Sequence, residues 1–168
     1  MPAPQTQFFT NSPSGSRKVQ LIPIVGYCSK MVYGWAIGKR KDTEVALKAW
    51  KRAKRTFKKV DIDYKDMIIH HDRDPVFTGY RWLRQVIIKD GLQISFAQRG
   101  AKDNTVMESF NSHFKGEFQS LFLDASSLKE LRNIIEERMR YYNEERLHST
   151  LDYKSPVDYI KTIKGERK

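Results

Sequence analysis

Apolar and polar positions follow two different periods along the chain, and the alternation between them predicts both strands and helices. Apolar stretches over residues 19–25 and 31–37, joined by a short turn, predict a β-hairpin, and the aromatic pair Phe8–Phe9 predicts a short strand before it. Further strands are expected over residues 67–69 and 92–96, the latter because apolar and polar side chains alternate. A hairpin followed by strands that alternate with helices predicts a mixed sheet.

Apolar residues at helical spacing predict the helices that cover this sheet. The first helix is expected to begin at Asp42 or Thr43, and another spans residues 78–89 and ends at Gly91. Two long helices follow, and Ser127 with Glu130 forms a capping box at the start of the second. The apolar stripes of the first helix and of the two long helices are Ala46, Ala49, Trp50, Ala53 and Phe57; Met107, Phe110, Phe114, Phe118 and Leu121; and Leu128, Leu131, Ile135, Met139 and Tyr142.

The length of 168 residues suits one α/β domain with one core, spanning residues 1–168. Within it we expect an irregular start over 1–18 and a C-terminal tail over 150–168. No apolar run approaches the roughly 20 residues of a membrane-spanning helix, so no membrane partner is expected. Cys28 is the only cysteine, which excludes an intramolecular disulfide and favours a cytoplasmic location.

Basic charge is concentrated in one helix. Residues 39–59 hold ten Lys or Arg against two acidic residues, which is +8 of the chain's net charge of +11. The basic face over residues 48–59 is predicted to bind a polyanion such as nucleic acid through Lys48, Lys51, Arg52 and Arg55. The alternative is a solvated amphipathic helix whose cations only keep the protein soluble.

Two acidic residues stand where a metal site is expected. Asp72 follows a short buried strand, and ligand sites in such sheets lie just beyond the carboxyl ends of strands. Glu108 lies in the first turn of a long helix and shares a face with Asn111, Ser112 and Lys115. An acid, an amide, a hydroxyl and an ammonium on one face suit a phosphodiester site. Each acid alone has an ordinary structural explanation, as a helix cap or as a partner of the helix dipole.

Three segments carry a resemblance to a known family. The runs HHDRDPVFTGYRW, KDNTVMESFNSHFKGE and YYNEERLHSTLDYKSPVDY resemble the catalytic cores of insertion-sequence transposases and retroviral integrases. The resemblance implies an α/β, ribonuclease H-like fold with a mixed sheet of about five strands flanked by helices. It makes Asp72 and Glu108 the second and third acids of the Asp-Asp-Glu triad, Lys115 a DNA contact, and two Mg²⁺ (or Mn²⁺) ions the cofactors; Asn111, on the same helix face, is then expected to contact the DNA as well. The implied partners are transposon-end and target DNA and further copies of the chain in a homo-oligomer.

The first acid of that triad is missing. Its counterpart lies in the segment 6–10, where Gln7 occupies the acid's place, and Gly26 replaces a second aspartate common in the family's hairpin. A neutral amide offers a metal no charge. The helix-turn-helix region that the resemblance implies upstream is also not in this sequence, so we expect a truncated core.

Three functions therefore remain open. The first is metal-dependent DNA cleavage and strand transfer, in which paired metals stabilise the attacking and leaving oxygens at phosphorus. The second is a catalytically inactive remnant that still binds DNA, which the Gln7 substitution favours. The third is a ribonuclease H-like nuclease that acts on hybrids or damaged DNA.

Overall fold

The hairpin and the short strand before it form one antiparallel sheet. The computed structural model describes residues 6–10, 17–98 and 105–165. Strand β1 (Thr6–Thr10) pairs with β2 (Arg17–Val25), and β2 pairs with β3 (Val32–Gly38), in the order β1-β2-β3. The predicted hairpin and the predicted aromatic strand are thus confirmed.

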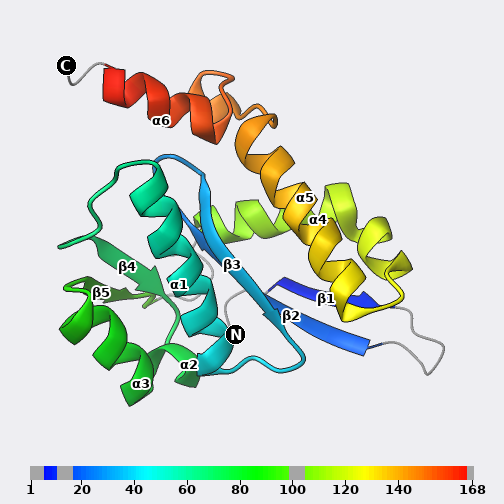
Figure 1. Cartoon of the computed structure of the whole chain (residues 1–168), viewed down its shortest axis with the longest axis horizontal. Helices are drawn as coiled ribbons and strands as arrows, with labels where there is room; N and C mark the ends of the chain where they lie inside the picture. The colour runs from blue at the N-terminus through cyan, green and yellow to red at the C-terminus, as the bar shows by residue number, and fades with distance from the viewer. Residues whose placement is uncertain (1–5, 11–16, 99–104, 166–168) are drawn as a thin grey trace.

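The other two strands form a separate parallel pair, β4 (Ile68–His71) with β5 (Gln93–Phe96). Figure 1 shows this pair apart from the hairpin sheet, with α1 (Thr43–Lys59) between them. All five predicted strands are present among the described residues, which hold them as an antiparallel three-stranded sheet and a parallel pair and not as one continuous ladder. No backbone ladder joins β4 to β2 in this part of the chain, although both strands were predicted at the right places.

Helix α1 begins where the sequence predicts, because the Asp42 side chain accepts a hydrogen bond from the Val45 N–H at 2.9 Å. Its apolar stripe packs on the hairpin sheet, and all five predicted stripe residues are buried. Gly34 of β3 makes this packing close: a Cβ at that position would lie 2.3 Å from the Ala49 carbonyl oxygen and 2.4 Å from the Ala53 nitrogen. The strand and the helix therefore touch backbone to backbone.

The predicted helix over residues 78–89 is confirmed from Tyr80 to Lys89, and a separate short helix precedes it. Helix α2 (Pro75–Thr78) starts earlier, capped by the Asp74 side chain, and Gly79 in an extended conformation separates it from α3 (Tyr80–Leu83). A π-helix, Arg84–Lys89, continues the chain to Gly91, which has a φ of 72° and ends it as predicted. The break follows from Pro75 after a capping aspartate, which starts a separate turn.

The two long predicted helices are α4 (Thr105–Asp124) and α5 (Leu128–Glu144). Ser127 caps α5 as predicted, since the Glu130 N–H donates to Ser127 Oγ at 3.1 Å; the reciprocal bond of the predicted capping box comes from the neighbouring residue, because the Glu130 carboxylate accepts from the Ser126 N–H at 2.8 Å. On α4 the buried stripe ends in Phe122, whereas Leu121 is exposed, so the prediction of Leu121 was wrong by one position. A 3₁₀ turn (Ser149–Leu151) and α6 (Pro156–Gly165) follow.

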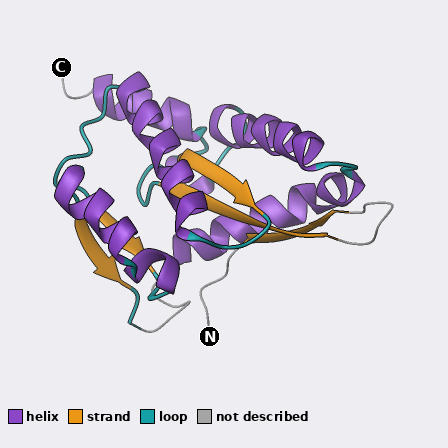
Figure 2. Ribbon diagram, turned by 60° about the horizontal axis from the view of Figure 1, so that its bottom comes forward, coloured by secondary structure: helices purple, strands orange, loops and turns teal. Residues whose placement is uncertain are grey.

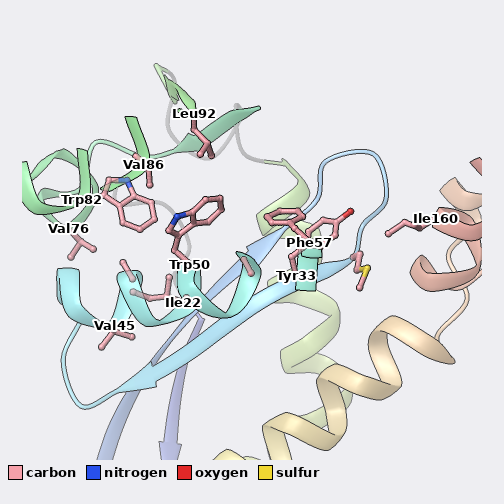
Figure 3. Close-up of a cluster of buried hydrophobic side chains, with 14 residues drawn as sticks. Ile22, Tyr33, Val45, Trp50, Phe57, Val76, Trp82, Val86, Leu92 and Ile160 are labelled. Atoms are coloured by element: carbon pink, nitrogen blue, oxygen red, sulfur yellow. The ribbon is translucent and has the colours of Figure 1, made fainter. Parts of the chain in front are cut away.

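Helices cover both faces of the hairpin sheet, so two hydrophobic clusters form instead of the single core that was predicted. Helices α4 and α5 pack on one face (Figure 2), where Trp35 and Leu21 meet the phenylalanines of α4. On the other face, α1 brings Trp50 towards Trp82 and Leu92 and places Phe57 beside Tyr33 (Figure 3). None of the described helices is both long and apolar enough to cross a membrane.

Candidate nucleic-acid interface and carboxylate site

A buried histidine holds the end of β4. His71 is 6% exposed, stacks on Phe77 with ring centroids 4.9 Å apart, and accepts a hydrogen bond at Nε2 from Trp82 Nε1 at 3.2 Å. Its Nδ1 therefore carries the proton and donates to the backbone oxygen of Asp72 at 3.0 Å. Burial lowers the pKa of His71, which keeps the ring neutral. The aromatic packing thus positions the backbone of Asp72 at the strand end.

The Asp72 carboxylate faces a cation of the chain itself. The Lys41 ammonium lies 3.9 Å from Asp72 Oδ2 and 2.8 Å from Asp74 Oδ2, and it stands 5.3 Å from the centre of the Phe77 ring. The side chains of Lys41 and Asp72 are only 12% and 13% exposed. A largely buried ammonium thus balances the negative charge that a metal ion would otherwise neutralise.

Glu108 lies in the first turn of α4 and is half-buried. The residues directly before it in the chain line the same cavity as Asp72. Asp72, Thr105, Val106 and Met107 line one cavity, whereas the described lining does not include Glu108. Within residues 6–10, 17–98 and 105–165, no three His, Cys, Asp or Glu side chains gather as a group that could hold a metal ion.

The position that the resemblance assigns to the first acid lies on the hairpin sheet. Gln7 is in β1, directly opposite Gln20 of β2 in the strand register. No carboxylate is available from that position. Asp74, a conceivable replacement, caps α2 and pairs with Lys41.

The two predicted DNA contacts on α4 differ in their surroundings. Asn111 is 5% exposed and belongs to the buried side of the helix. Lys115 is half-buried and lies two turns beyond Glu108 on the same side. Of the two, only Lys115 retains the exposure that a phosphate contact needs.

The basic residues of α1 line a groove. Lys48, Lys51, Arg52 and Arg55, all predicted from the sequence, are joined there by Lys59 of α1 and Arg132 of α5, around a space of about 680 Å³. The described lining holds six cations and no acidic side chain. Four of the six are the DNA contacts predicted from the basic charge on this face of the helix. Arg132 was missed because nothing in the sequence indicates that α5 reaches α1.

The groove is shaped by β3, which is the edge strand of its sheet and supplies Trp35, Ala36 and Ile37 as its floor. Arg52 lies 4.3 Å over the Trp35 ring and pairs with Glu136, which holds its guanidinium in place. Trp50 and Phe57, on the buried side of α1, line the other cavity together with Asp72. The groove and the Asp72 carboxylate therefore lie on opposite sides of α1.

Comparison with protein families places both halves of the chain in one group. A family model described as "Integrase core domain" matches residues 5–102, and a second model with the same description matches residues 90–156. The transposase for insertion sequence element IS904 of Lactococcus lactis is 31% identical over 79% of this chain and 51% of its own length. The putative transposase InsK for IS150 of Escherichia coli is 25% identical over 92% of this chain and 51% of its own. The chain spans about half the length of these relatives.

Solved structures agree on the fold. The HTLV-2 integrase catalytic core domain, solved in complex with magnesium, superposes with a TM-score of 0.65 at 15% identity, over 93% of this chain and 92% of that one. The catalytic core domain of BIV integrase superposes with a TM-score of 0.62 at 12% identity, over 98% and 97%. The predicted ribonuclease H-like fold is thereby confirmed, and the chain belongs to the integrase core domain family of transposases and integrases.

Proposed function

We propose that this chain is the core of an insertion-sequence transposase that binds DNA through the groove between α1, β3 and α5, with an incomplete site for DNA cleavage and joining. The observation that carries the binding proposal is the groove's lining of six cations without an acid. Phosphate contacts from Lys and Arg supply most of the sequence-independent affinity of a protein for DNA. As the relatives are transposases, the proposed DNA is transposon-end and target DNA in a bacterial cytoplasm, bound by a homo-oligomer.

Three features support an incomplete site. Gln7 stands at the first-acid position, Lys41 already pairs with Asp72 and Asp74, and the described residues hold no group of three metal ligands. A carboxylate paired with a buried ammonium gains little from a second cation. Binding without metal-dependent cutting is therefore the function that the geometry supports best.

The binding proposal is tested by the salt dependence of DNA affinity. Wild type is compared with the variant Lys48→Ala/Lys51→Ala/Arg55→Ala by fluorescence anisotropy on a labelled duplex across a range of salt concentrations. Each phosphate contact that is lost should make the slope of log K against log salt shallower by about 0.9. The matched control replaces three exposed lysines outside the groove, Lys65, Lys89 and Lys129. Equal slopes for the groove variant and the control would rule the groove out as the binding surface.

A second candidate function is metal-dependent DNA cleavage and strand transfer, with Mg²⁺ or Mn²⁺ held by Asp72 and Glu108. It is favoured by one observation: Asp72 and the first turn of α4 line the same cavity. This function requires divalent-metal-dependent nicking that is lost in Asp72→Asn. A ribonuclease H-like nuclease would instead cleave an RNA–DNA hybrid in preference to joining duplex ends.

A further inference from the structure

The Lys41 ammonium lies between two carboxylates and an aromatic ring. Its Nζ is 2.8 Å from Asp74 Oδ2, 3.9 Å from Asp72 Oδ2 and 5.3 Å from the centre of the Phe77 ring. The three charged side chains are between 12% and 20% exposed, so protein replaces most of the water that would solvate them. A buried charge is stable only when it is paired. Lys41 therefore has a defined place in the fold, unlike a solvated surface lysine.

The chain is anchored on both sides of this ion pair. Lys41 directly precedes the N-cap of α1, and Asp74 is itself the N-cap of α2, because its Oδ1 accepts from the Val76 N–H at 2.9 Å. Figure 1 shows α2 beside the start of α1, and the Thr43 hydroxyl donates to the Val76 backbone oxygen at 3.3 Å. The two helix starts are thus joined, which keeps the ammonium beside Asp72.

The two aspartates contact the ammonium differently. Asp74 forms a direct ion pair at 2.8 Å, through the carboxylate oxygen that does not cap α2. Asp72 Oδ2, at 3.9 Å, is too far for a direct hydrogen bond but close enough for strong attraction between the charges. Asp72 Oδ1 accepts a long bond from the Asp74 N–H at 3.4 Å. Asp74 therefore holds the cation in place, and the cation neutralises Asp72 through space.

A divalent ion on Asp72 would lie close to this ammonium. A metal bound to Asp72 Oδ2 at about 2.1 Å would be at most about 6 Å from Lys41 Nζ, which itself lies 3.9 Å from that oxygen. Like charges at such a distance in a largely buried place repel strongly, because little water lies between them. The ammonium therefore lowers the affinity of Asp72 for divalent ions, whichever other ligands the ion has.

We propose that Lys41 is the resident counter-ion of Asp72: held in place by Asp74, its ammonium neutralises the Asp72 carboxylate and weakens the binding of divalent metal ions there. The inference deepens the incomplete site proposed above and rests on the assignment of Asp72 as a metal-site acid. Loss of the ammonium should therefore strengthen metal binding, which the loss of a merely structural ion pair would not do.

The test is Mn²⁺ binding by the full chain without DNA, with free Mn²⁺ followed by electron paramagnetic resonance. The variants are Asp72→Asn, Lys41→Gln and the double variant Lys41→Gln/Asp72→Asn. Lys65→Gln removes an exposed lysine and is the matched control for the change in net charge. Thermal unfolding with and without Mn²⁺ verifies that each protein is folded. If Lys41→Gln is unfolded, Lys41→Gln/Asp74→Asn takes its place, because removing both partners of a buried ion pair costs less than removing one.

We expect Lys41→Gln to bind Mn²⁺ at least about tenfold more tightly than wild type, and Lys65→Gln to bind like wild type. Adding Asp72→Asn should abolish the gain. Equal Mn²⁺ binding by wild type and the folded Lys41 variant overturns the inference, and so does a gain that survives Asp72→Asn.

The same titrations separate this inference from the proposals on which it rests. If Asp72→Asn weakens Mn²⁺ binding but Lys41→Gln does not strengthen it, Asp72 remains a metal-site acid and only the role of Lys41 is wrong. Because the titrations contain no DNA, a failure of groove binding in the salt-dependence test is a separate result.

Discussion

At the residue scale, Asp90 is the clearest case of one side chain joining distant segments. Its carboxylate accepts hydrogen bonds from Trp50 Nε1 at 2.7 Å, Lys54 Nζ at 2.9 Å and Gln85 Nε2 at 2.8 Å. Burial alone would raise the pKa of Asp90, but the bonds from Gln85, Trp50 and Lys54 together lower it. The carboxylate therefore connects α1 to the end of the π-helix.

Asp90→Ala should lower the free energy of unfolding by about 2–4 kcal/mol, because it leaves the Trp50 N–H and the Lys54 ammonium without their acceptor in a largely buried place. Urea denaturation measures the change. Asp124→Ala, at an exposed position, is the matched control and should change stability by less than about 0.5 kcal/mol. Equal effects of the two substitutions would show that the Asp90 bonds contribute nothing.

His148 makes stability depend on pH. Burial, and then the nearby Arg146 guanidinium, lower the pKa of His148 to about 4. Above the unfolded pKa of about 6.5 the ring is neutral in both states; as the pH falls from there towards about 4, only the unfolded chain takes up the proton. The free energy of unfolding should therefore decrease across this window. In urea denaturation at a series of pH values, His148→Gln should make that decrease smaller. Replacement of the exposed His70 should leave the decrease unchanged. Identical curves for wild type and His148→Gln would show that His148 does not cause the pH dependence.

Single residues also show how far the site could be predicted. Asp72, Glu108 and the cations of α1 were found because strand ends, helix starts and helical spacing are local patterns. Lys41 beside Asp72 and Arg132 beside α1 could not be found in this way, since both pairings depend on how distant elements pack. Gln7 was identified only through the family resemblance.

At the scale of elements, the close approach of β3 to α1 gives a pair of opposite predictions. Gly34→Ala should destabilise the protein by at least about 1–3 kcal/mol, because the added Cβ overlaps the backbone of α1 and forces the two elements apart. Gly116→Ala should stabilise it by up to about 1 kcal/mol, because nothing lies within 4 Å of that Cβ and alanine favours a helix. Thermal unfolding of both variants compares them directly, and a Gly34→Ala protein as stable as wild type would show that the backbones are not in contact.

Helices that begin with a clear capping residue were predicted at the correct first residue. The caps Asp42 and Ser127 set the starts of α1 and α5 to the residue. Helix α6 was missed and treated as tail, although the sequence Ser155-Pro156 followed by Asp158 is itself a start signal: the Asp158 N–H donates to Ser155 Oγ at 3.2 Å, and Ser155 Oγ donates to Asp158 Oδ2 at 3.0 Å. The break at Gly79 was also missed, because the apolar spacing runs on through it.

At the scale of the whole molecule, the strands were predicted but their assembly was not. Residue patterns indicate which side chains are buried, yet they do not state which strands pair, because pairing depends on the neighbours that each edge finds. The described strands accordingly form an antiparallel sheet and a parallel pair, a division that the residue pattern did not indicate. The same separation places Gln7 on one sheet and Asp72 at the end of the other.

Nicking of terminal-repeat DNA tests most directly whether the chain binds DNA with an incomplete cleavage site. It is measured with Mg²⁺ and with Mn²⁺ for wild type, Asp72→Asn and Gln7→Asp, and the DNA affinity of each protein is recorded as well. The account predicts that wild type and Asp72→Asn bind DNA equally well and that neither nicks it, and that any metal-dependent nicking appears only in Gln7→Asp. Nicking by wild type that Asp72→Asn abolishes would contradict it, because the acids already present would then suffice for catalysis.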